Sequence, residues 1–160
     1  MKSTIPLKLK VLKKLAFDLN EAKITWNLGA SANLYLRGIV SDFHDLDIMI
    51  LEKDVEKVKE IMSNIALLKD KKPSSNFGTK IFLNYMIDTV DIDIMAGFAI
   101  KHQEKMHHFP LRENMIFDVY LLDDVKIYLE DIDIWLTYYV LMERKDKINI
   151  IKTYMKEVEK

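Results

Sequence analysis

The sequence predicts an α/β protein of the α+β kind, in which a mixed β-sheet is flanked by helices. Segments near both ends of the chain repeat their apolar residues at helical spacing. The middle of the chain contains short apolar runs, rich in β-branched and aromatic residues and separated by turn-forming residues, which are typical of strands. A helical pattern between two such runs favours a crossover connection within one sheet.

Composition bounds the size and the class of the protein. At 160 residues the chain is long enough to form one domain, 1–160, with a real apolar core. The formal net charge of −1 provides no general attraction to nucleic acid, which is therefore not an expected partner. The absence of cysteine excludes disulfides and thiolate metal sites and fits a cytoplasmic protein. Lysines interrupt the N-terminal apolar residues and no apolar run is long enough to span a bilayer, so neither a signal peptide nor a membrane segment is expected.

The first part of the chain predicts a helix, a strand and a short second helix. In residues 6–22 apolar residues recur at helical spacing. The run ITWNL, residues 24–28, is apolar and β-branched and predicts a strand, and Gly29 is expected to supply the backbone freedom for a sharp exit. The next helix is expected from Ala32 to about Ile39, with Ser31 at its beginning. The lysines of the first helix are expected to form a solvated face rather than a binding surface: Lys8, Lys10, Lys13 and Lys14.

The start of the second helix and the strand after it are the candidates for chemistry. The second helix begins with small residues, so its first backbone N–H groups are accessible at the positive end of the helix dipole. Together with the hydroxyl of Ser31, these groups suit a phosphate. In residues 44–50, HDLDIMI, polar and apolar residues alternate, so a strand directs Asp45 and Asp47 to one face and apolar residues to a core. Two carboxylates about 7 Å apart on one strand face suit a hard divalent cation. The alternative is a solvated edge strand, although strands disfavour Asp.

The rest of the chain predicts one more helix, three hairpins and a C-terminal helical part. A helix is predicted over 53–67, and 69–78, which combines Pro, Ser, Asn and Gly, is expected to be a surface loop at the mouth of the site. The predicted hairpins pair 80–87 with 90–96 across Asp88-Thr89, 98–103 with 106–110, and 117–122 with 125–129. The helical part covers about 131–160, with an acidic cap at its start and an amphipathic helix over 145–160.

The chain contains, in this order, a Gly-Ala-Ser turn at residues 29–31, a helix, and a strand with Asp45-Leu46-Asp47. This order resembles the nucleotidyltransferase superfamily with the polymerase-β-like fold. The resemblance covers residues 24–98 by motif and the remainder by layout, which is close to that of the small lincosamide and aminoglycoside nucleotidyltransferases. That family needs a third carboxylate on a later strand, and VDIDIMAGF, residues 90–98, offers Asp91 and Asp93 on one face. Asp93 is favoured because an apolar residue and a turn follow it as in the family strand, and Asp91 is the second choice.

The resemblance implies an enzyme that transfers a nucleoside monophosphate, with AMP the expected group, from an NTP to a hydroxyl group, releasing pyrophosphate. Two Mg²⁺ ions and ATP are the implied cofactor and donor, and Asp45 and Asp47 are implied to hold the metals. Asp93 is implied to share one metal and to accept the proton of the attacking hydroxyl. The implied acceptor is a small molecule. There are two alternatives. One is a non-catalytic nucleotide-binding module, and the other is an enzyme that modifies a protein or tRNA, as in toxin–antitoxin relatives.

Phosphate binding is assigned to the turn before the second helix. Gly29, Ala30 and Ser31 would hold the departing phosphates through backbone N–H groups and the hydroxyl. Arg37 follows an apolar helix face and either reaches the triphosphate or pairs with an acid.

Several other polar residues are interpreted as structural. Asp131-Ile132-Asp133 copies the acidic pattern but opens a helix, where a cap is expected. His102, His107 and His108 lack the helical spacing of a zinc site and are expected either to line the acceptor pocket or to lie in a surface loop. The aromatic residues at helical spacing near the C-terminus are expected in a core: Trp135, Tyr138 and Tyr139.

Overall fold

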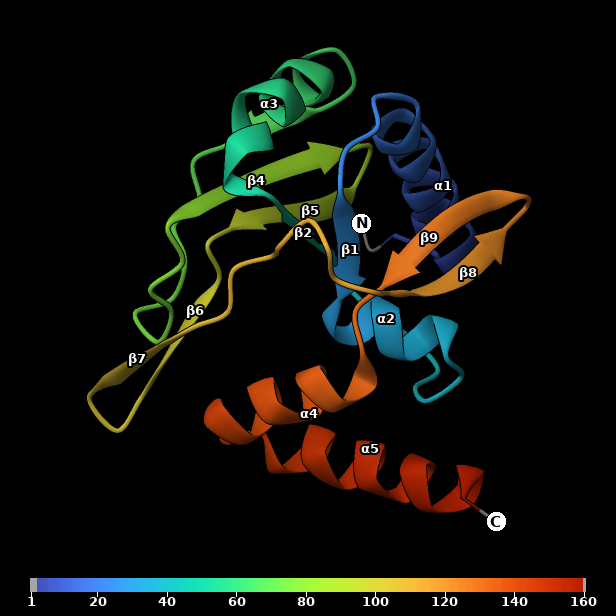
Figure 1. Ribbon diagram of the computed structural model, residues 1–160. Coiled ribbons are helices and arrows are strands. Elements are labelled where there is room, and N and C mark those ends of the chain that lie inside the picture. Colours follow the sequence, from blue (N-terminus) through green and yellow to red (C-terminus); the bar gives the residue numbers. More distant parts are fainter. Residues whose placement is uncertain (1–2, 160) are drawn as a thin grey trace.

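The computed structural model describes residues 3–159 and confirms a mixed sheet flanked by helices, with two helices at the C-terminal end (Figure 1). The large sheet has seven strands in the order β3-β4-β5-β2-β1-β9-β8, and β6 and β7 form a separate two-stranded sheet. The elements are α1 (Ile5–Glu21), β1 (Trp26–Gly29), α2 (Ala30–Leu36), β2 (Leu46–Ile50), the 3₁₀ turn η1 (Glu52–Asp54), α3 (Val55–Ser63), β3 (Leu67–Lys69), β4 (Ile81–Ile87), β5 (Val90–Ala96), β6 (Ala99–His102), β7 (Lys105–His108), β8 (Asp118–Leu122), β9 (Val125–Leu129), α4 (Ile132–Leu141) and α5 (Lys145–Val158).

The centre of the sheet is the parallel pair β2 and β5. Parallel neighbours require a crossover, and the segment that contains α3 supplies it, as the strand–helix–strand order predicts. The predicted helix over 53–67 is shorter than expected, because its first turn is the 3₁₀ turn η1 and the chain enters β3 at Leu67. Strand β3 was not predicted, since three exposed residues are too few to display a period of two. It pairs antiparallel with β4 at the edge of the sheet.

Helices α1 and α3 contribute to one core, which includes the apolar face of β2. Leu46, Ile48 and Ile50 are each at most 1% exposed and belong to this core, as the alternation in 44–50 predicts. Leu12 and Leu15 of α1 are fully buried in the same core. The opposite face of β2 therefore remains available for its acidic residues.

Helices α4 and α5 belong to a second core, which includes Met49 and Met95 from the other face of the sheet. Trp135 of α4 lies edge-to-face with Tyr138, with ring centroids 4.9 Å apart, and 5.4 Å from Tyr139. These aromatic residues are buried, as expected from their helical spacing. The second core fixes α4 against the end of β1, where the candidate phosphate-binding residues lie.

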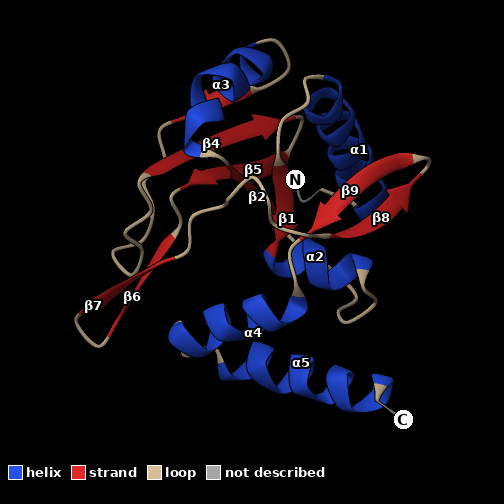
Figure 2. Ribbon diagram, viewed as in Figure 1, coloured by secondary structure: helices blue, strands red, loops and turns tan. Residues whose placement is uncertain are grey.

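The predicted hairpins are confirmed (Figure 2), and each strand end lies within two residues of its expected position. In the β4–β5 hairpin, Ile87 faces Val90 across the two-residue turn Asp88-Thr89. Asp131 caps α4, since its carboxylate accepts a hydrogen bond of 2.8 Å from the backbone N–H of Asp133. Within residues 3–159 no helix combines the length and the apolar character that crossing a membrane requires.

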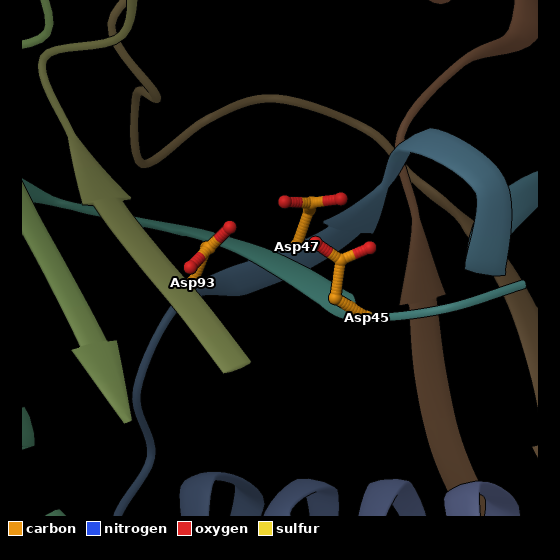
Figure 3. Close-up of side chains that lie close together, drawn as sticks. All are labelled: Asp45, Asp47 and Asp93. Carbon is orange, nitrogen blue, oxygen red and sulfur yellow. The ribbon is translucent and has the colours of Figure 1, made fainter. Parts of the chain in front are cut away.

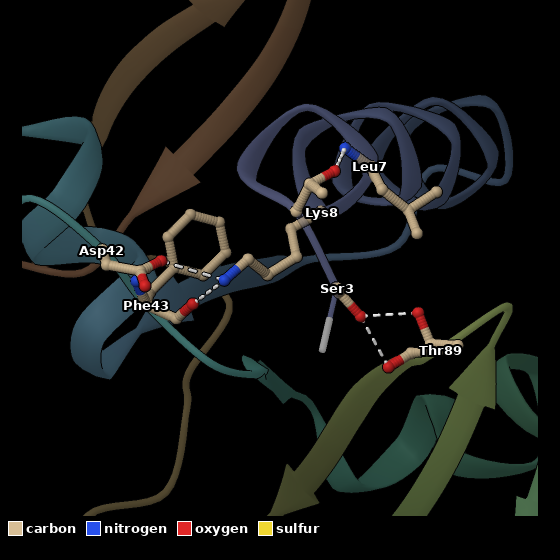
Figure 4. A network of polar contacts seen from close by, with 7 residues as sticks. Ser3, Leu7, Lys8, Asp42, Phe43 and Thr89 are labelled. Atoms are coloured by element: carbon tan, nitrogen blue, oxygen red, sulfur yellow. Dashed lines mark hydrogen bonds and ion pairs between the residues drawn. The ribbon is translucent and has the colours of Figure 1, made fainter. Parts of the chain in front are cut away.

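Lys8 corrects the expectation that the α1 lysines form a solvated face. Its side chain is buried at 3% exposure and reaches the segment that leads into β2 (Figure 4). The ammonium donates to the backbone carbonyl of Phe43 and to Asp42 at 2.9 Å, and lies 4.8 Å from the centroid of the Phe43 ring. Lys10, in contrast, is exposed. A lysine stem can cover apolar surface while its ammonium finds oxygen partners, and helical periodicity does not reveal those partners.

Candidate functional site

Three carboxylates from two neighbouring strands form the candidate site. Asp45 immediately precedes β2, Asp47 lies on β2, and Asp93 lies on β5 directly beside Asp47 in the parallel register. One oxygen from each carboxylate lies within 4.8 Å of the others. All three side chains project from the same side of the sheet, away from α1 (Figure 3). The register of two strands that are far apart in sequence thus creates a compact cluster of oxygen atoms.

Asp91 lies outside this cluster. It is on the same strand as Asp93 and faces Met86 of β4 across the antiparallel pair. Its charge still acts on Asp93, where it is one of the smaller influences that raise the pKa. The structure therefore brings Asp93, the first choice of the sequence prediction, into the cluster with Asp45 and Asp47.

The cluster concentrates negative charge in a site that is partly removed from water. Burial, together with the charges of Asp45 and Asp93, raises the pKa of Asp47 well above its usual range. Burial also raises the pKa of Asp93, while a hydrogen bond from Asn84 and the charge of Lys71 act in the opposite direction. A bound cation would remove this repulsion, because it would interact favourably with the ionised form of each carboxylate.

Asn84 of β4 holds Asp93 in place. Its side-chain amide donates a buried hydrogen bond of 2.6 Å to Oδ1 of Asp93. The two residues face each other across the β4–β5 hairpin. Sequence analysis missed Asn84, although counting equally outward from the two-residue turn Asp88-Thr89 pairs it with Asp93.

The turn after β1 differs from the sequence expectation. Gly29 has an extended backbone, with φ −121° and ψ −168°, and the left-handed conformation falls on Ala30, with φ 53°. Helix α2 begins at Ala30 rather than Ala32, so Ser31 lies inside its first turn, and it ends at Leu36. The absence of a side chain at Gly29 has another reason, because a Cβ there would lie 2.2 Å from Cζ2 of Trp135. Packing of α4, rather than backbone freedom, requires glycine at this position.

A lysine from the C-terminal helix approaches the same turn. The Nζ atom of Lys147 on α5 lies 3.4 Å from the hydroxyl oxygen of Ser31. Sequence analysis did not single out Lys147, because the contact joins positions that are 116 residues apart. Ser31 and Lys147 together offer a hydroxyl and a positive charge on the β1 side of the carboxylate cluster.

Arg37 pairs with an acid, which is one of the two roles expected for it. Its guanidinium contacts Asp118 of β8 at 2.8 Å, and it also donates to Asn33 at 2.7 Å and to the backbone carbonyl of Glu130 at 2.9 Å. These contacts join α2 to β8 and to the end of β9. The expected contact of Arg37 with the triphosphate stays a prediction.

The histidines of the β6–β7 hairpin do not form a group of three metal-binding side chains among residues 3–159. His102 and His107 have ring centroids 6.3 Å apart on the two strands of the hairpin. Lys80, which follows the predicted loop, forms an exposed ion pair of 3.0 Å with Glu52. These residues lie outside the carboxylate cluster.

Comparison with known proteins identifies the fold. The sequence matches no protein-family model and no curated protein sequence. Solved nucleotidyltransferase structures share the fold, in agreement with the resemblance seen in the sequence. One, a nucleotidyltransferase candidate from Thermotoga maritima, aligns with a TM-score of 0.73 and 20% identity over 98% of this chain and 97% of that chain.

Two further neighbours are antibiotic-modifying enzymes. The lincosamide antibiotic adenylyltransferase LnuA, with lincomycin bound, aligns with a TM-score of 0.61 and 15% identity over 95% of this chain and 98% of that chain. ANT(2″)-Ia, in complex with adenylyl-2″-tobramycin, aligns with a TM-score of 0.60 and 10% identity over 94% of this chain and 92% of that chain. At such identities the likeness establishes the fold, and the function must be argued from the site.

Proposed function

We propose that this protein is a metal-dependent nucleotidyltransferase. It transfers a nucleoside monophosphate, AMP from ATP, to the hydroxyl group of a small molecule and releases pyrophosphate. The observation that carries the proposal is the cluster of Asp45, Asp47 and Asp93, whose oxygens lie within 4.8 Å of one another. The adenylyltransferases among the structural neighbours support adenine as the base and a small molecule as the acceptor.

The three carboxylates fit divalent metal ions. Carboxylate oxygens are the ligands that Mg²⁺ prefers, and the repulsion that raises the pKa of Asp47 is relieved by a cation. Asp45 and Asp47 would hold two Mg²⁺ ions with the nucleotide, and Asp93 would share one of them. When bound, the metal ions stabilise the charge on the attacking and the leaving oxygen.

The protein's own residues position the reactants and move one proton. Asp93 accepts the proton of the acceptor hydroxyl as that oxygen forms its bond to the α-phosphorus. The bond between the α-phosphorus and the oxygen that bridges to the β-phosphate breaks, and pyrophosphate leaves with the electron pair. Asn84 fixes the rotation of the Asp93 carboxylate through its 2.6 Å hydrogen bond. On the other side of β2, the hydroxyl of Ser31 and the ammonium of Lys147 would contact the departing phosphates, beside the backbone of Gly29 and Ala30.

Calorimetric titration with a non-hydrolysable ATP analogue and Mg²⁺ tests the metal and nucleotide site. We expect binding by the wild type and its loss in the double variant Asp45→Asn with Asp47→Asn, because the oxygens that hold the metal are removed. The double variant Asp123→Asn with Asp124→Asn changes the same charge in the exposed turn between β8 and β9 and should bind as the wild type does. Equal affinity of the wild type and the site variant would refute the proposed site.

A further inference from the structure

A hollow of about 220 Å³ borders the carboxylate cluster on the side of β5. Asp93 is part of its lining, together with the loop between β3 and β4. The strand order β4-β5-β2-β1 places this hollow on the opposite side of β2 from Ser31, which follows β1. In an in-line displacement the attacking and the leaving oxygen lie on opposite sides of the α-phosphorus. A hydroxyl group that attacks from this hollow would meet Asp93 first, and pyrophosphate would leave towards Ser31 and Lys147.

The deeper lining of the hollow is apolar. Phe77, Phe82 and Met95 line it, and Met95 is 7% exposed while the two phenylalanines are half-buried. Phe77 is held by the second core, where its ring centroid lies 5.9 Å from that of Phe98. Aromatic and thioether side chains of this kind favour a flat or aliphatic body.

The rim of the hollow is basic. Lys71 and Lys72 line it, both are exposed, and Asp93 is the single acidic residue of the lining. Lys71 and Asp93 line the same hollow, so this ammonium lies on the β5 side of the cluster. The two ammonium groups therefore place positive charge at the mouth of the hollow, beside the cluster.

We propose, on the basis of the function proposed above, that the acceptor is a small hydroxylated anion with an apolar, ring-sized body. The apolar lining would hold the ring, the lysines would attract the negative group, and the hydroxyl would face Asp93. The volume is below the roughly 300–1,000 Å³ of sites for drug-sized ligands, which matches a compound of about one ring. Polycations such as tobramycin, present in adenylylated form in the complex of one structural neighbour, are disfavoured by the same lysines.

Three phenols of similar size and different charge test this inference. Tyramine is a cation, 4-hydroxyphenylethanol is neutral and 3-(4-hydroxyphenyl)propanoate is an anion, and each carries the same ring and phenolic hydroxyl. Binding is measured by ligand-observed NMR in the presence of Mg²⁺ and the non-hydrolysable ATP analogue, so the result does not depend on turnover. We expect the anion to bind at least about tenfold more tightly than the cation, the size of effect that complementary charges at a binding site produce.

Charge reversal at the rim is the decisive variant. Lys71→Glu with Lys72→Glu should reverse the order of the anion and the cation, measured with the ATP analogue and Mg²⁺ still bound. Lys10→Glu with Lys14→Glu is the matched control, because it changes the same charge on exposed residues of α1, on the other face of the sheet. The control should retain the order of the wild type.

The outcomes separate this inference from the function on which it depends. A preference for tyramine, equal binding of the three phenols or no binding of any of them would overturn the proposed acceptor class. Loss of nucleotide binding in the charge-reversed variant, with an unchanged order of the phenols, would assign the lysines to the triphosphate and likewise overturn it. Failure of the wild type to bind the ATP analogue with Mg²⁺ would instead refute the proposed function itself.

Discussion

Replacing Gly29 with alanine tests the packing of α4 against the end of β1. An added Cβ would lie 2.2 Å from Cζ2, 2.6 Å from Cε2 and 2.8 Å from Nε1 of Trp135, whereas ordinary contacts begin near 3.4 Å. The indole has little room to retreat, because it is 3% exposed and packs against Phe98, Tyr138 and Tyr139. Overpacking of this kind costs about 1–3 kcal/mol, and we expect Gly29→Ala to lower the free energy of unfolding by that amount.

The same change made in a Trp135→Phe background isolates the contact. Phenylalanine lacks the Nε1 and Cζ2 atoms that the Cβ would meet, and the extended backbone of Gly29 is one that alanine adopts without strain. Without the indole, Gly29→Ala should stabilise the fold by about 0.4–1 kcal/mol, since alanine reduces the entropy of the unfolded chain. The two backgrounds should therefore differ by about 1.5–4 kcal/mol, a coupling that a double-mutant cycle resolves.

Urea denaturation of the four proteins, followed by circular dichroism, provides the free energies of unfolding. An equal cost of Gly29→Ala in both backgrounds would refute the packing argument. It would indicate that the backbone at the end of β1, and not the indole, requires glycine.

Three further predictions concern single side chains. Asp93→Asn should reduce the rate of pyrophosphate release by at least about 10²-fold, because the base is lost. The rate of Asp91→Asn should stay within about tenfold of the wild type, and reversed rates would assign the base to Asp91. Lys8→Ala should lower the free energy of unfolding, measured by urea denaturation, by about 2–4 kcal/mol, because the buried Phe43 carbonyl loses its donor and the aromatic ring loses its cation. Lys10→Ala, at an exposed position, should change it by less than about 0.5 kcal/mol. Similar costs of the two substitutions would contradict the burial argument. Burial raises the pKa of Glu130 from 4.5 to about 7, so between these pH values the folded protein retains a proton that the unfolded chain releases. The free energy of unfolding of the wild type should therefore fall by about 3 kcal/mol as pH rises through this window, and this fall should be absent in Glu130→Gln. Parallel pH profiles of the two proteins would argue against the raised pKa.

The sequence by itself determined most of the elements and, within the strands of the site, the face to which each side chain points. In residues 44–50 the period of two was enough to assign Leu46 and Ile48 to the core and Asp45 and Asp47 to the other face, because successive side chains of a strand alternate. The two-residue turn at Asp88-Thr89 likewise determined the β4–β5 hairpin. These are local properties, in which a residue and its near neighbours contain all the information needed.

Only the tertiary structure decided which distant residues meet. The parallel register of β2 and β5 places Asp93 rather than Asp91 in the cluster, although both alternate in the same way along the strand. Lys147 reaches Ser31 from a helix 116 residues away, and Gly29 is required by the indole of Trp135 on α4. The shared physical reason is that periodicity defines the face on which a side chain lies, while pairing and packing between elements define what that face meets.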